Sequence, residues 1–434
     1  ACVVRLTCAD PPLTADLRYW LVGDQPYLRK TITLSGGAVI DSLSLLSVRT
    51  DLPLRGGGRG LPVFLGDDWW FGVEYPGFLG ELTSNGFVLT HFPGRSADGT
   101  WSSKTMVLGV APPGLPLPLA FDDYLQTIKR PARSFLQYNT WYDVRDAEMT
   151  LEHFERTASA FEQHLLQPYG LHMDSYQPDD GWQNPQSVWG VRADIYPNGF
   201  GPLARLLEAH GSRMGLWLSL LGVKLDIAWG REQGYEVSST GASYCIAGPR
   251  SFAATRDAVQ RLIREGNIIY FKHDFNALNC AADGHGHLPT QRHGFEANLD
   301  AELKLLAFER ELQPDIFLNV TSNVWLSPWW LQHADTIWMG ASDFGFDRSF
   351  PQLSPREWEM SYRDVYFHRV YLQQHNPTPL SALMTHGIIH GKRNRLGGPH
   401  ERLREWADYV ALYYGRGVLL KELYLSPELL DAER

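Results

Sequence analysis

The stretch Ile268-Ile269-Tyr270-Phe271-Lys272-His273-Asp274-Phe275-Asn276 changes character abruptly, and this change decides the predicted fold. Its first four residues are apolar, which is typical of a strand buried on both faces of a parallel sheet. Charged and amide side chains follow at once, as they do where parallel strands end at a functional site. Because side chains alternate along a strand, Lys272 and Asp274 point to the same side. The stretch therefore predicts a parallel strand that carries an ammonium group and a carboxylate into one site.

From Ser134 onward, apolar runs alternate with segments of helical period. The expected strands cover Phe135–Tyr142, Gly170–Asp174, Arg213–Leu218, Ile268–His273, Ile316–Val320, Thr336–Gly340, Ser381–Thr385 and Gly417–Leu420. The expected helices cover Ala147–Leu165, Gly201–His210, Ser251–Glu265, Asn298–Leu312, Pro355–Leu372 and Glu401–Tyr414. Strands that alternate with helices in this number predict an α/β fold, a (β/α)₈ TIM barrel. An open doubly wound sheet is the alternative, but no glycine-rich phosphate turn follows a strand to support it.

The chain before the barrel has a different pattern, with short alternating runs separated by turn clusters. Tyr27–Leu34 and Phe87–Phe92 are such runs, and Arg55–Gly60 is a glycine-rich turn cluster. The proline-rich segment Ala111–Pro118 indicates a boundary, and Phe121–Arg130 is expected to form a bridging helix. We therefore predict an N-terminal β-sandwich domain with a linker helix over residues 1–130 and a catalytic barrel over residues 131–434.

The composition fits a globular enzyme and disfavours two classes of partner. The 434 residues suit a barrel plus a second module. A net charge of −10 argues against a nucleic-acid partner, which usually requires a basic face. No apolar run reaches the roughly 18 residues that a membrane helix needs, so no membrane partner is expected. The 15 Trp, 19 Tyr and 20 Phe favour a carbohydrate ligand, since aromatic faces stack on sugar rings, although aromatic residues also fill cores.

Four cysteines, Cys2, Cys8, Cys245 and Cys280, are too few for a disulfide framework in a chain of this length. Cys2 and Cys8 could pair within the N-terminal domain or remain free thiols. The first residue is Ala1 rather than Met, so a leader or tag could have been removed. The cellular location stays open, with the cytoplasm favoured over secretion.

Carboxylates follow several of the expected strands, at the end of a barrel where catalytic residues lie. Asp179-Asp180-Gly181-Trp182 follows the second strand, Asp274 the fourth and Asp343 the sixth. Glycoside cleavage needs two carboxyls, one to attack the anomeric carbon and one to protonate the leaving oxygen. We predict Asp274 as the nucleophile and Asp343 as the acid/base, with Asp347 as the competing acid/base. Lys272 would keep Asp274 ionised, although the two could instead form a structural ion pair that caps the strand.

These residues occur in motifs that resemble those of the glycoside hydrolase family 36 α-galactosidases. Phe271–Asn276 resembles the nucleophile motif of that family, Lys-Trp-Asp-x-Asn, and Asp179–Trp182 is similar to its sugar-binding Asp-Asp-Gly-Trp. Ile337-Trp338 followed by Ser342-Asp343 resembles the Ile-Trp-x-Ser-Asp stretch that carries the acid/base of the family. Shorter similarities lie at Asn139–Tyr142, Asn198–Ala204 and Arg213–Trp217. The motifs follow the family's order over most of the chain, although each is short.

The resemblance implies a retaining glycosidase that cleaves a terminal α-linked sugar, with α-galactosides as the first candidate, by double displacement. Asp179 and Asp180 would accept hydrogen bonds from sugar hydroxyls, and a tryptophan would stack on the ring. The substrate-binding residues that it implies are Asp179, Asp180, Trp182, Lys272, Trp141, Asn276 and Trp217. It also implies a carbohydrate as the partner, no cofactor and no metal, and a homo-oligomer is a further expectation.

The chain departs from the family pattern at four places. His273 replaces the usual Trp, and Gly340-Ala341 is an insertion before the expected acid/base. Asn319–Trp325 replaces the family's Cys-x-Gly-Gly-Gly-Arg segment after the fifth strand, which shapes the sugar pocket, so the identity of the sugar stays open. The chain also stops at Arg434 without the family's C-terminal β-sandwich, which indicates either a truncated protein or a short member.

Other classes of function compete with the glycosidase. Asp283–His287 and His293 have the residue types of a metal-dependent barrel hydrolase. They lie in a glycine-containing loop about ten residues past the fourth strand, so a polar loop is expected there. The family motifs also resemble those of a transglycosidase of the raffinose-synthase type, and a catalytically inactive sugar-binding protein would retain them as well.

Overall fold

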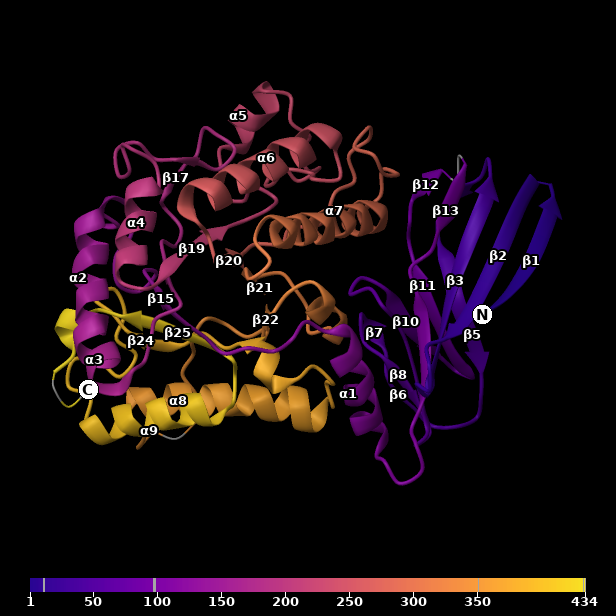
Figure 1. Ribbon diagram of the computed structural model, residues 1–434. Helices are drawn as coiled ribbons and strands as arrows, with labels where there is room; N and C mark the ends of the chain where they lie inside the picture. Colours follow the sequence, from indigo (N-terminus) through magenta and orange to yellow (C-terminus); the bar gives the residue numbers. More distant parts are fainter. Residues whose placement is uncertain (11, 97–98, 350, 432, 434) are drawn as a thin grey trace.

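The N-terminal part of the protein consists of short antiparallel strands (Figure 1). The structure is a computed structural model that describes residues 1–10, 12–96, 99–349, 351–431 and 433. The strands are β1 (Cys2–Ala9), β2 (Pro12–Leu21), β3 (Tyr27–Gly36), β4 (Val39–Ile40), β5 (Leu43–Arg49), β6 (Leu54–Gly56), β7 (Gly58–Arg59), β8 (Val63–Leu65), β9 (Trp69–Val73), β10 (Leu79–Thr83), β11 (Gly86–His91), β12 (Arg95–Ser96), β13 (Thr100–Ser102) and β14 (Met106–Val110). The glycine cluster Arg55–Gly60, predicted as a turn, belongs mostly to β6 and β7. Gly57 connects these two strands with a φ of 79°, which residues with a Cβ rarely adopt.

Two of the N-terminal sheets face each other. The larger has the order β1-β2-β3-β14-β9-β8-β6 with β13 beside β3, and the other has the order β5-β11-β10-β7. The rings of Phe71 on β9 and Phe87 on β11 lie 5.0 Å apart across the space between them. Both residues are buried, together with Leu45 and Leu89 of the second sheet and Val63 of the first. The predicted β-sandwich is therefore confirmed.

A curled parallel sheet follows, and its strand order is β23-β22-β21-β20-β19-β16-β15-β25-β24. Its strands are β15 (Phe135–Asn139), β16 (Ser175–Gln177), β19 (Arg213–Leu218), β20 (Tyr270–His273), β21 (Phe317–Val320), β22 (Thr336–Trp338), β23 (Leu383–Met384), β24 (Ile388–His390) and β25 (Leu420–Leu425). Only Thr385, His386 and Gly387 separate β23 from β24, the two ends of this order. The sheet thus closes through a seventh strand that is split in two, which confirms the barrel. A small hairpin, β17 (Gln183–Asn184) and β18 (Gly190–Val191), lies outside it.

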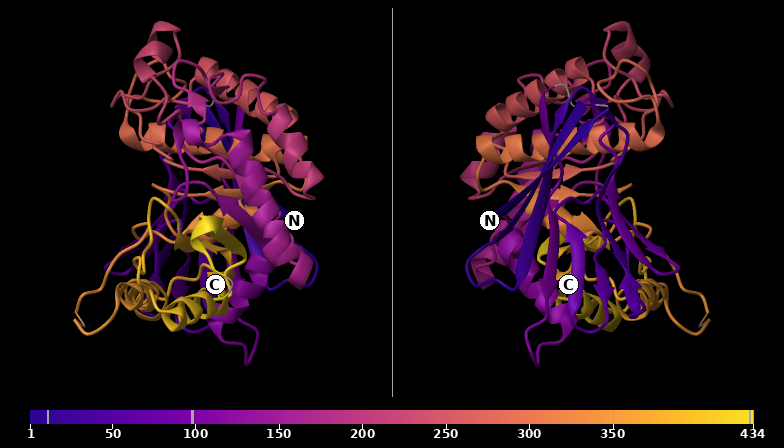
Figure 2. Two further views of the ribbon diagram at one scale, coloured as in Figure 1. Left: turned by 90° about the vertical axis from the view of Figure 1, so that its left-hand side faces the viewer. Right: turned by 90° about the vertical axis from the view of Figure 1, so that its right-hand side faces the viewer.

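Helices surround the curled sheet (Figures 1 and 2). They are α1 (Leu117–Ile128), α2 (Leu151–Phe161), α3 (Gln167–Tyr169), α4 (Gly201–Ala209), α5 (Ile227–Glu232), α6 (Pro249–Gly266), α7 (Gln291–Leu312), α8 (Pro355–Phe367) and α9 (Leu403–Gly415). Thr290 caps α7 by accepting a hydrogen bond from the backbone N–H of His293, so this helix begins seven residues before the predicted Asn298. Among the described residues, no helix is long and apolar enough to cross a membrane.

Two barrel strands begin later than the sequence predicts. The second, predicted at Gly170–Asp174, is β16 at Ser175–Gln177. Gly170 ends the preceding helix in the left-handed conformation, and Leu171 is exposed, so a buried strand cannot begin there. Asp174 consequently lies at the start of β16, where its carboxylate accepts a hydrogen bond from the backbone of Leu136, and not at the mouth. The eighth strand is likewise displaced, because Gly417 turns the chain before β25.

The N-terminal sheets pack against one side of the barrel (Figure 1). Trp329, in the 3₁₀ turn Pro328–Gln332, is fully buried at this junction. Its ring lies 5.5 Å from that of Phe78, and a Cβ on Gly72 would come within 2.3 Å of it, so only glycine fits there. On α7, Glu296 accepts hydrogen bonds from His91 and from the backbone of Phe92. The boundary at residue 130 stays a prediction.

Cys2 and Cys8 do not pair. They lie on the same strand, β1, where Cys2 is opposite Tyr19 and Cys8 is opposite Leu13. Six residues of extended chain separate their Cα atoms by about 20 Å, far beyond the reach of a disulfide. Both are exposed free thiols.

Candidate active site

A cavity of about 230 Å³ lies at the carboxyl ends of the barrel strands. Seven of the nine predicted site residues line it, namely Trp141, Asp179, Asp180, Trp217, Lys272, Asp274 and Asp343. The same wall includes Lys224, Phe275, Thr321, Ser322, Trp338, Met384 and His386. The carboxyl end of the barrel thus gathers the carboxylates that were predicted to follow the second, fourth and sixth strands.

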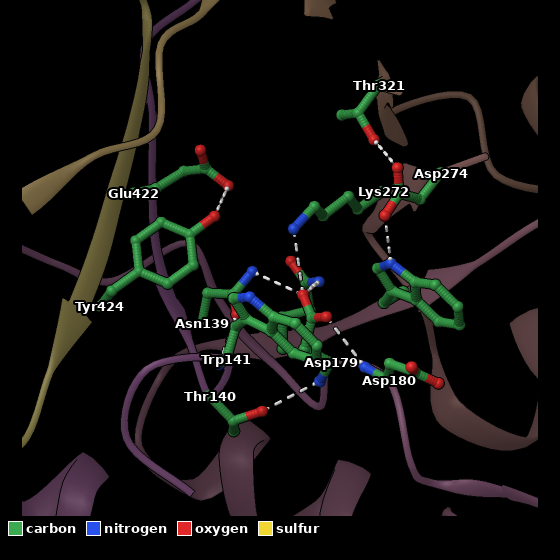
Figure 3. Close-up of polar contacts among 12 residues, drawn as sticks. Asn139, Thr140, Trp141, Asp179, Asp180, Lys272, Asp274, Thr321, Glu422 and Tyr424 are labelled. Carbon is green, nitrogen blue, oxygen red and sulfur yellow. Dashed lines mark hydrogen bonds and ion pairs between the residues drawn. The ribbon is translucent and has the colours of Figure 1, made fainter. Parts of the chain in front are cut away.

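Asp274 directly follows β20, and its backbone N–H donates to the carbonyl of Leu218 on β19. Its carboxylate is nearly buried and is held on both oxygens. Oδ1 accepts hydrogen bonds from the hydroxyl of Thr321 at 2.7 Å and from the backbone N–H of Phe275 at 2.9 Å. Oδ2 accepts the indole N–H of Trp217 at 3.0 Å. These contacts, of which Figure 3 labels the one with Thr321, fix the direction of the carboxylate toward the cavity.

Asp274 is held in its ionised form. Burial alone would raise the pKa of its carboxyl, but the charge of Lys272 and hydrogen bonds from Ser322, Trp217 and Thr321 outweigh burial and lower it. The next residue, Phe275, has a φ of 51°, an uncommon conformation for a residue with a bulky side chain. A charged, oriented carboxylate beside a strained residue is the arrangement that a nucleophile needs.

Lys272 lies beside Asp274 on the inner side of the barrel, and Figure 3 shows its ammonium group pointing to Asp179. Nζ is 3.2 Å from Asp179 Oδ2. The same oxygen accepts hydrogen bonds from Asn139 at 2.9 Å and Gln177 at 3.0 Å. Burial would lower the pKa of Lys272, but the surrounding carboxylates of Asp179, Asp274 and others raise it. Lys272 therefore stays charged.

Asp180 is less tightly held than Asp179. Gln183 donates to its Oδ1 at 2.7 Å, and Lys224 Nζ lies 3.7 Å from its Oδ2. Burial raises the pKa of Asp180, with Asp179 adding to the effect, while Gln183 and Lys224 oppose it. Asp180 thus offers the cavity a carboxylate whose second oxygen has only a distant charged partner.

Asp343 follows β22, the sixth strand, and lines the cavity with its side chain 52% exposed. The phenol of Tyr142 donates to its Oδ2 at 3.1 Å, and His386 Nε2 lies 3.4 Å from its Oδ1. Burial and the charges of Lys272 and Arg363 hold the pKa of His386 well below its ordinary value, so this imidazole is neutral. Asp347, the competing acid/base, does not line this cavity, and its carboxylate accepts a hydrogen bond from the backbone of Ser349.

Two predicted substrate-binding residues lie outside the cavity. Trp182 is fully buried, and its indole N–H donates to the carbonyl of Trp217 at 2.8 Å, so its ring has no face open to a sugar. Asn276 is also buried, and its amide donates to the carbonyls of Thr321 and Ser322, which ties the end of β20 to the end of β21. Their direct contact with substrate, predicted from the motifs, is not supported by these positions.

Trp141 and Trp217 remain at the cavity, each with one side already engaged. The guanidinium of Arg145 lies 3.4 Å from the centre of the Trp141 ring and covers one of its faces. The indole N–H of Trp217 is used by Asp274. Trp141 is only half-buried, so the face of its ring opposite Arg145 remains for stacking on a sugar.

Thr321 and His386 line this cavity but were not among the predicted site residues. Thr321 directly follows the predicted fifth strand, and His386 is the first residue beyond the predicted seventh, so the rule that found Asp274 applies to both. Thr321 belongs to the segment Asn319–Trp325 that departs from the family pattern. The other end of this segment reaches the N-terminal domain, where Trp325 donates to the carbonyl of Pro76 at 2.8 Å. The divergent segment therefore supports the site as well as the domain junction.

On β20, the side chain of His273 points out of the barrel toward α7. Its Nε2 is 2.9 Å from Glu309 Oε2, and both residues are fully buried. Glu302 lies about two helical turns before Glu309 on the same helix and is also fully buried. No described residue donates a hydrogen bond to its carboxyl. Burial, with the charge of Glu309, raises the pKa of Glu302 to about 8. The fold therefore favours the protonated form of Glu302.

This buried carboxyl predicts a pH dependence of stability. Because its pKa is raised from an ordinary value of 4.5 to about 8, its contribution is fully present below pH 4.5 and is lost as the pH rises through 8. Between pH 5 and pH 9, this carboxyl is expected to lower the free energy of unfolding by an amount on the order of 3–5 kcal/mol. We expect Glu302→Met to abolish that decrease. Urea unfolding at both pH values measures it. Glu311→Met, an exposed glutamate on the same helix, is the control; parallel pH profiles for the protein and Glu302→Met would contradict the prediction.

The protein thus combines an N-terminal β-sandwich with a (β/α)₈ barrel whose mouth is rich in carboxylates. No protein-family model matches the chain, and no curated protein matches its sequence. Solved structures of glycoside hydrolase family 36 α-galactosidases do share the fold. AgaA of Geobacillus stearothermophilus, in complex with 1-deoxygalactonojirimycin, aligns with a TM-score of 0.68 and 12% identity over 99% of this chain and 67% of its own.

Two further α-galactosidases give the same result. AgaB of the same organism has a TM-score of 0.63 at 13% identity, over 96% of this chain and 69% of its own. The enzyme of Lactobacillus brevis has a TM-score of 0.62 at 12% identity, over 99% of this chain and 64% of its own. The protein therefore has the fold of the family 36 α-galactosidases in a divergent form, and it spans about two thirds of the length of these enzymes.

Proposed function

We propose that this protein is a retaining glycoside hydrolase that removes a terminal α-linked sugar, with α-galactosides as its substrates. The observation that carries the proposal is the pairing of two unlike carboxyls on one cavity. Asp274 is nearly buried and kept ionised, whereas Asp343 is half-exposed on another strand end of the same cavity. Two carboxyls with different environments can take the two roles that glycoside cleavage requires.

In the first step, an oxygen of Asp274 forms a bond to the anomeric carbon as the bond to the leaving oxygen breaks. Asp343, in its protonated form, gives its proton to that oxygen. In the second step, the Asp343 carboxylate takes a proton from water, whose oxygen bonds to the anomeric carbon and releases Asp274. Two inversions leave the configuration unchanged. Tyr142, which hydrogen-bonds Asp343, would orient the acid in both steps.

The sugar ring would lie between Asp180 and Trp141. Asp180 has a carboxylate oxygen available to hydroxyls, and Lys272 is a donor at the floor of the cavity. Asp179 accepts three hydrogen bonds on one oxygen, so its role is to hold Lys272 and to offer its other oxygen to the sugar. A hydroxyl of the wrong configuration would leave one of these charged groups unpaired, which is the strongest form of substrate discrimination.

The cavity volume supports a single sugar in the site. At about 230 Å³ it is smaller than the roughly 300–1,000 Å³ of sites that enclose larger ligands. A site of this size suits the terminal residue of a chain, with the leaving part outside. The similar AgaA structures contain raffinose, stachyose or 1-deoxygalactonojirimycin, which favours galactose as that terminal residue.

A substrate panel tests the proposal. We expect hydrolysis of para-nitrophenyl α-galactoside, with α-galactose as the first product by NMR, and slower hydrolysis of the α-glucoside and α-mannoside. The assay is repeated with acceptor sugars, because a transglycosidase would transfer the sugar to the acceptor in preference to water. Formation of β-galactose first, or no product from any α-glycoside with or without acceptor, would contradict the proposal, and the latter would favour a sugar-binding protein.

The nucleophile is tested by Asp274→Ala. We expect kcat/KM to fall by at least about 10³-fold, because the variant lacks the carboxylate that would form the covalent intermediate. The circular dichroism spectrum and the unfolding midpoint should stay close to those of the parent, which separates loss of chemistry from loss of fold. Near-normal hydrolysis by this variant would exclude Asp274 as the nucleophile.

The acid/base is tested by Asp343→Ala and by the leaving group. An aryl leaving group needs little protonation, whereas a sugar leaving group needs an acid that contributes about 10²–10⁴-fold. We expect the variant to lose much more kcat/KM on an oligosaccharide than on the para-nitrophenyl substrate. Asp347→Ala, four residues away and outside the cavity, is the matched control and should behave like the parent. Equal losses on both substrates for Asp343→Ala would refute its role as the acid.

A further inference from the structure

Two cysteines and two histidines come together next to the barrel mouth, outside the cavity. Cys245 lies four residues before the start of α6, and Cys280, His285 and His287 lie in the segment between β20 and α7. One sulfur or ring nitrogen from each residue lies within 4.8 Å of all the others. Cys245, Cys280 and His287 are buried, and His285 is partly buried. In the sequence, the histidines were considered as metal ligands and the cysteines were not. A polar loop without metal was therefore expected there.

The spacing of these atoms fits a tetrahedral zinc ion. With Zn–S near 2.3 Å and Zn–N near 2.0 Å, the sulfur and nitrogen ligands of one ion lie about 3.6 Å apart. Cys245 Sγ is 3.4 Å from His287 Nε2, and Cys280 Sγ is 3.6 Å from His285 Nδ1. Cys₂His₂ is a common ligand set of structural zinc sites, and imidazole with thiolate disfavours magnesium or calcium.

The surroundings of the cluster prepare its atoms to bind a cation. His287 Nδ1 lies 2.8 Å from the carbonyl of Leu288, a contact that orients the ring with Nε2 toward Cys245, where this nitrogen can serve as a metal ligand. The backbone N–H of Ala282 donates to Cys280 Sγ, and the side-chain amide of Asn298 donates to Cys245 Sγ, both at 3.4 Å. Hydrogen bonds of this kind stabilise thiolates, the form of cysteine that binds metal.

The loop that carries the histidines is shaped to reach the cysteines. Gly284 and Gly286, on either side of His285, have φ values of 75° and 80°, which turn the chain back on itself. Gly294 at the start of α7 lies so close to the loop that a Cβ there would be 1.8 Å from the carbonyl of Cys280 and 3.0 Å from His287. A helix without a side chain at this point lets the loop close over the cluster.

We propose that Cys245, Cys280, His285 and His287 bind one structural Zn²⁺. Four protein ligands fill the coordination sphere and leave no position for water or substrate, so the ion is not catalytic. It would join the segment after β19, which carries Lys224, to the segment after β20, which begins with Asp274 and Phe275. The proposal concerns the construction of the cavity wall and does not depend on the reaction proposed above.

The test is metal analysis of a tag-free chain purified from zinc-containing medium. We expect about one zinc per chain by mass spectrometry, falling to about a tenth or less in Cys280→Ser and His287→Ala. Cys8→Ser and His172→Ala, an exposed cysteine and an exposed histidine elsewhere, are the matched controls and should retain the ion. Loss of zinc in the controls to the same extent would overturn the assignment of the ligands.

Measurements on the unaltered chain keep the test independent of how well the variants fold. Removal of zinc by a chelator should lower the unfolding temperature, and added zinc should restore it. Thiol titration in denaturant without reductant should find all four cysteines reactive. Two reactive thiols, the result expected of a Cys245–Cys280 disulfide, would overturn the proposal, and so would less than about a tenth of an equivalent of zinc after incubation with excess zinc and desalting.

Discussion

A buried ammonium group among carboxylates is the constraint on which the rest of the site depends. Lys272 is 5% exposed, and a charge buried to this extent is tolerated only when it is paired. Asp179 supplies the contact, and Asn139 and Gln177 hold Asp179 in place for it. The positive charge in turn keeps Asp274 ionised inside the protein. Strands one, two and four must therefore keep one register, because a shift of any of them would leave a charge unpaired.

The fold and the principal carboxylates could be predicted from the sequence because one physical rule governs both. An apolar run that ends in polar residues marks a buried strand and its mouth, and Asp274, Lys272 and Asp343 all obey it. The predicted second strand, Gly170–Asp174, is the exception. The strand of the structure begins only at Ser175, so Asp174 precedes it and does not lie at its mouth. Trp182 and Asn276 lie in the right motifs, but the sequence does not tell which side of a turn faces the cavity, and both are turned inward to hold neighbouring strands.

Contacts between segments that are distant along the chain could not be predicted from the sequence. Cys245 and Cys280 are separated by the whole of α6 and β20, and only the folded barrel brings them beside the two histidines. The segment Asn319–Trp325 is a similar case. Its departure from the family pattern raised doubt about the sugar, yet in the structure Thr321 bonds the nucleophile and Trp325 bonds the N-terminal domain. In this protein the divergent segment therefore supports both the site and the domain junction.

The split seventh strand has a consequence for how this barrel closes. Within the described residues, β23 pairs with β22 and β24 pairs with β25, and neither pairs with the other. The sheet is thus a hoop whose two ends meet at a seam, and the seam is made by His386, with a φ of 46°, and its neighbours. Asp179, Lys272 and Asp274 therefore belong to or follow strands that are paired on both sides, whereas His386, which lies 3.4 Å from Asp343, stands at the seam itself.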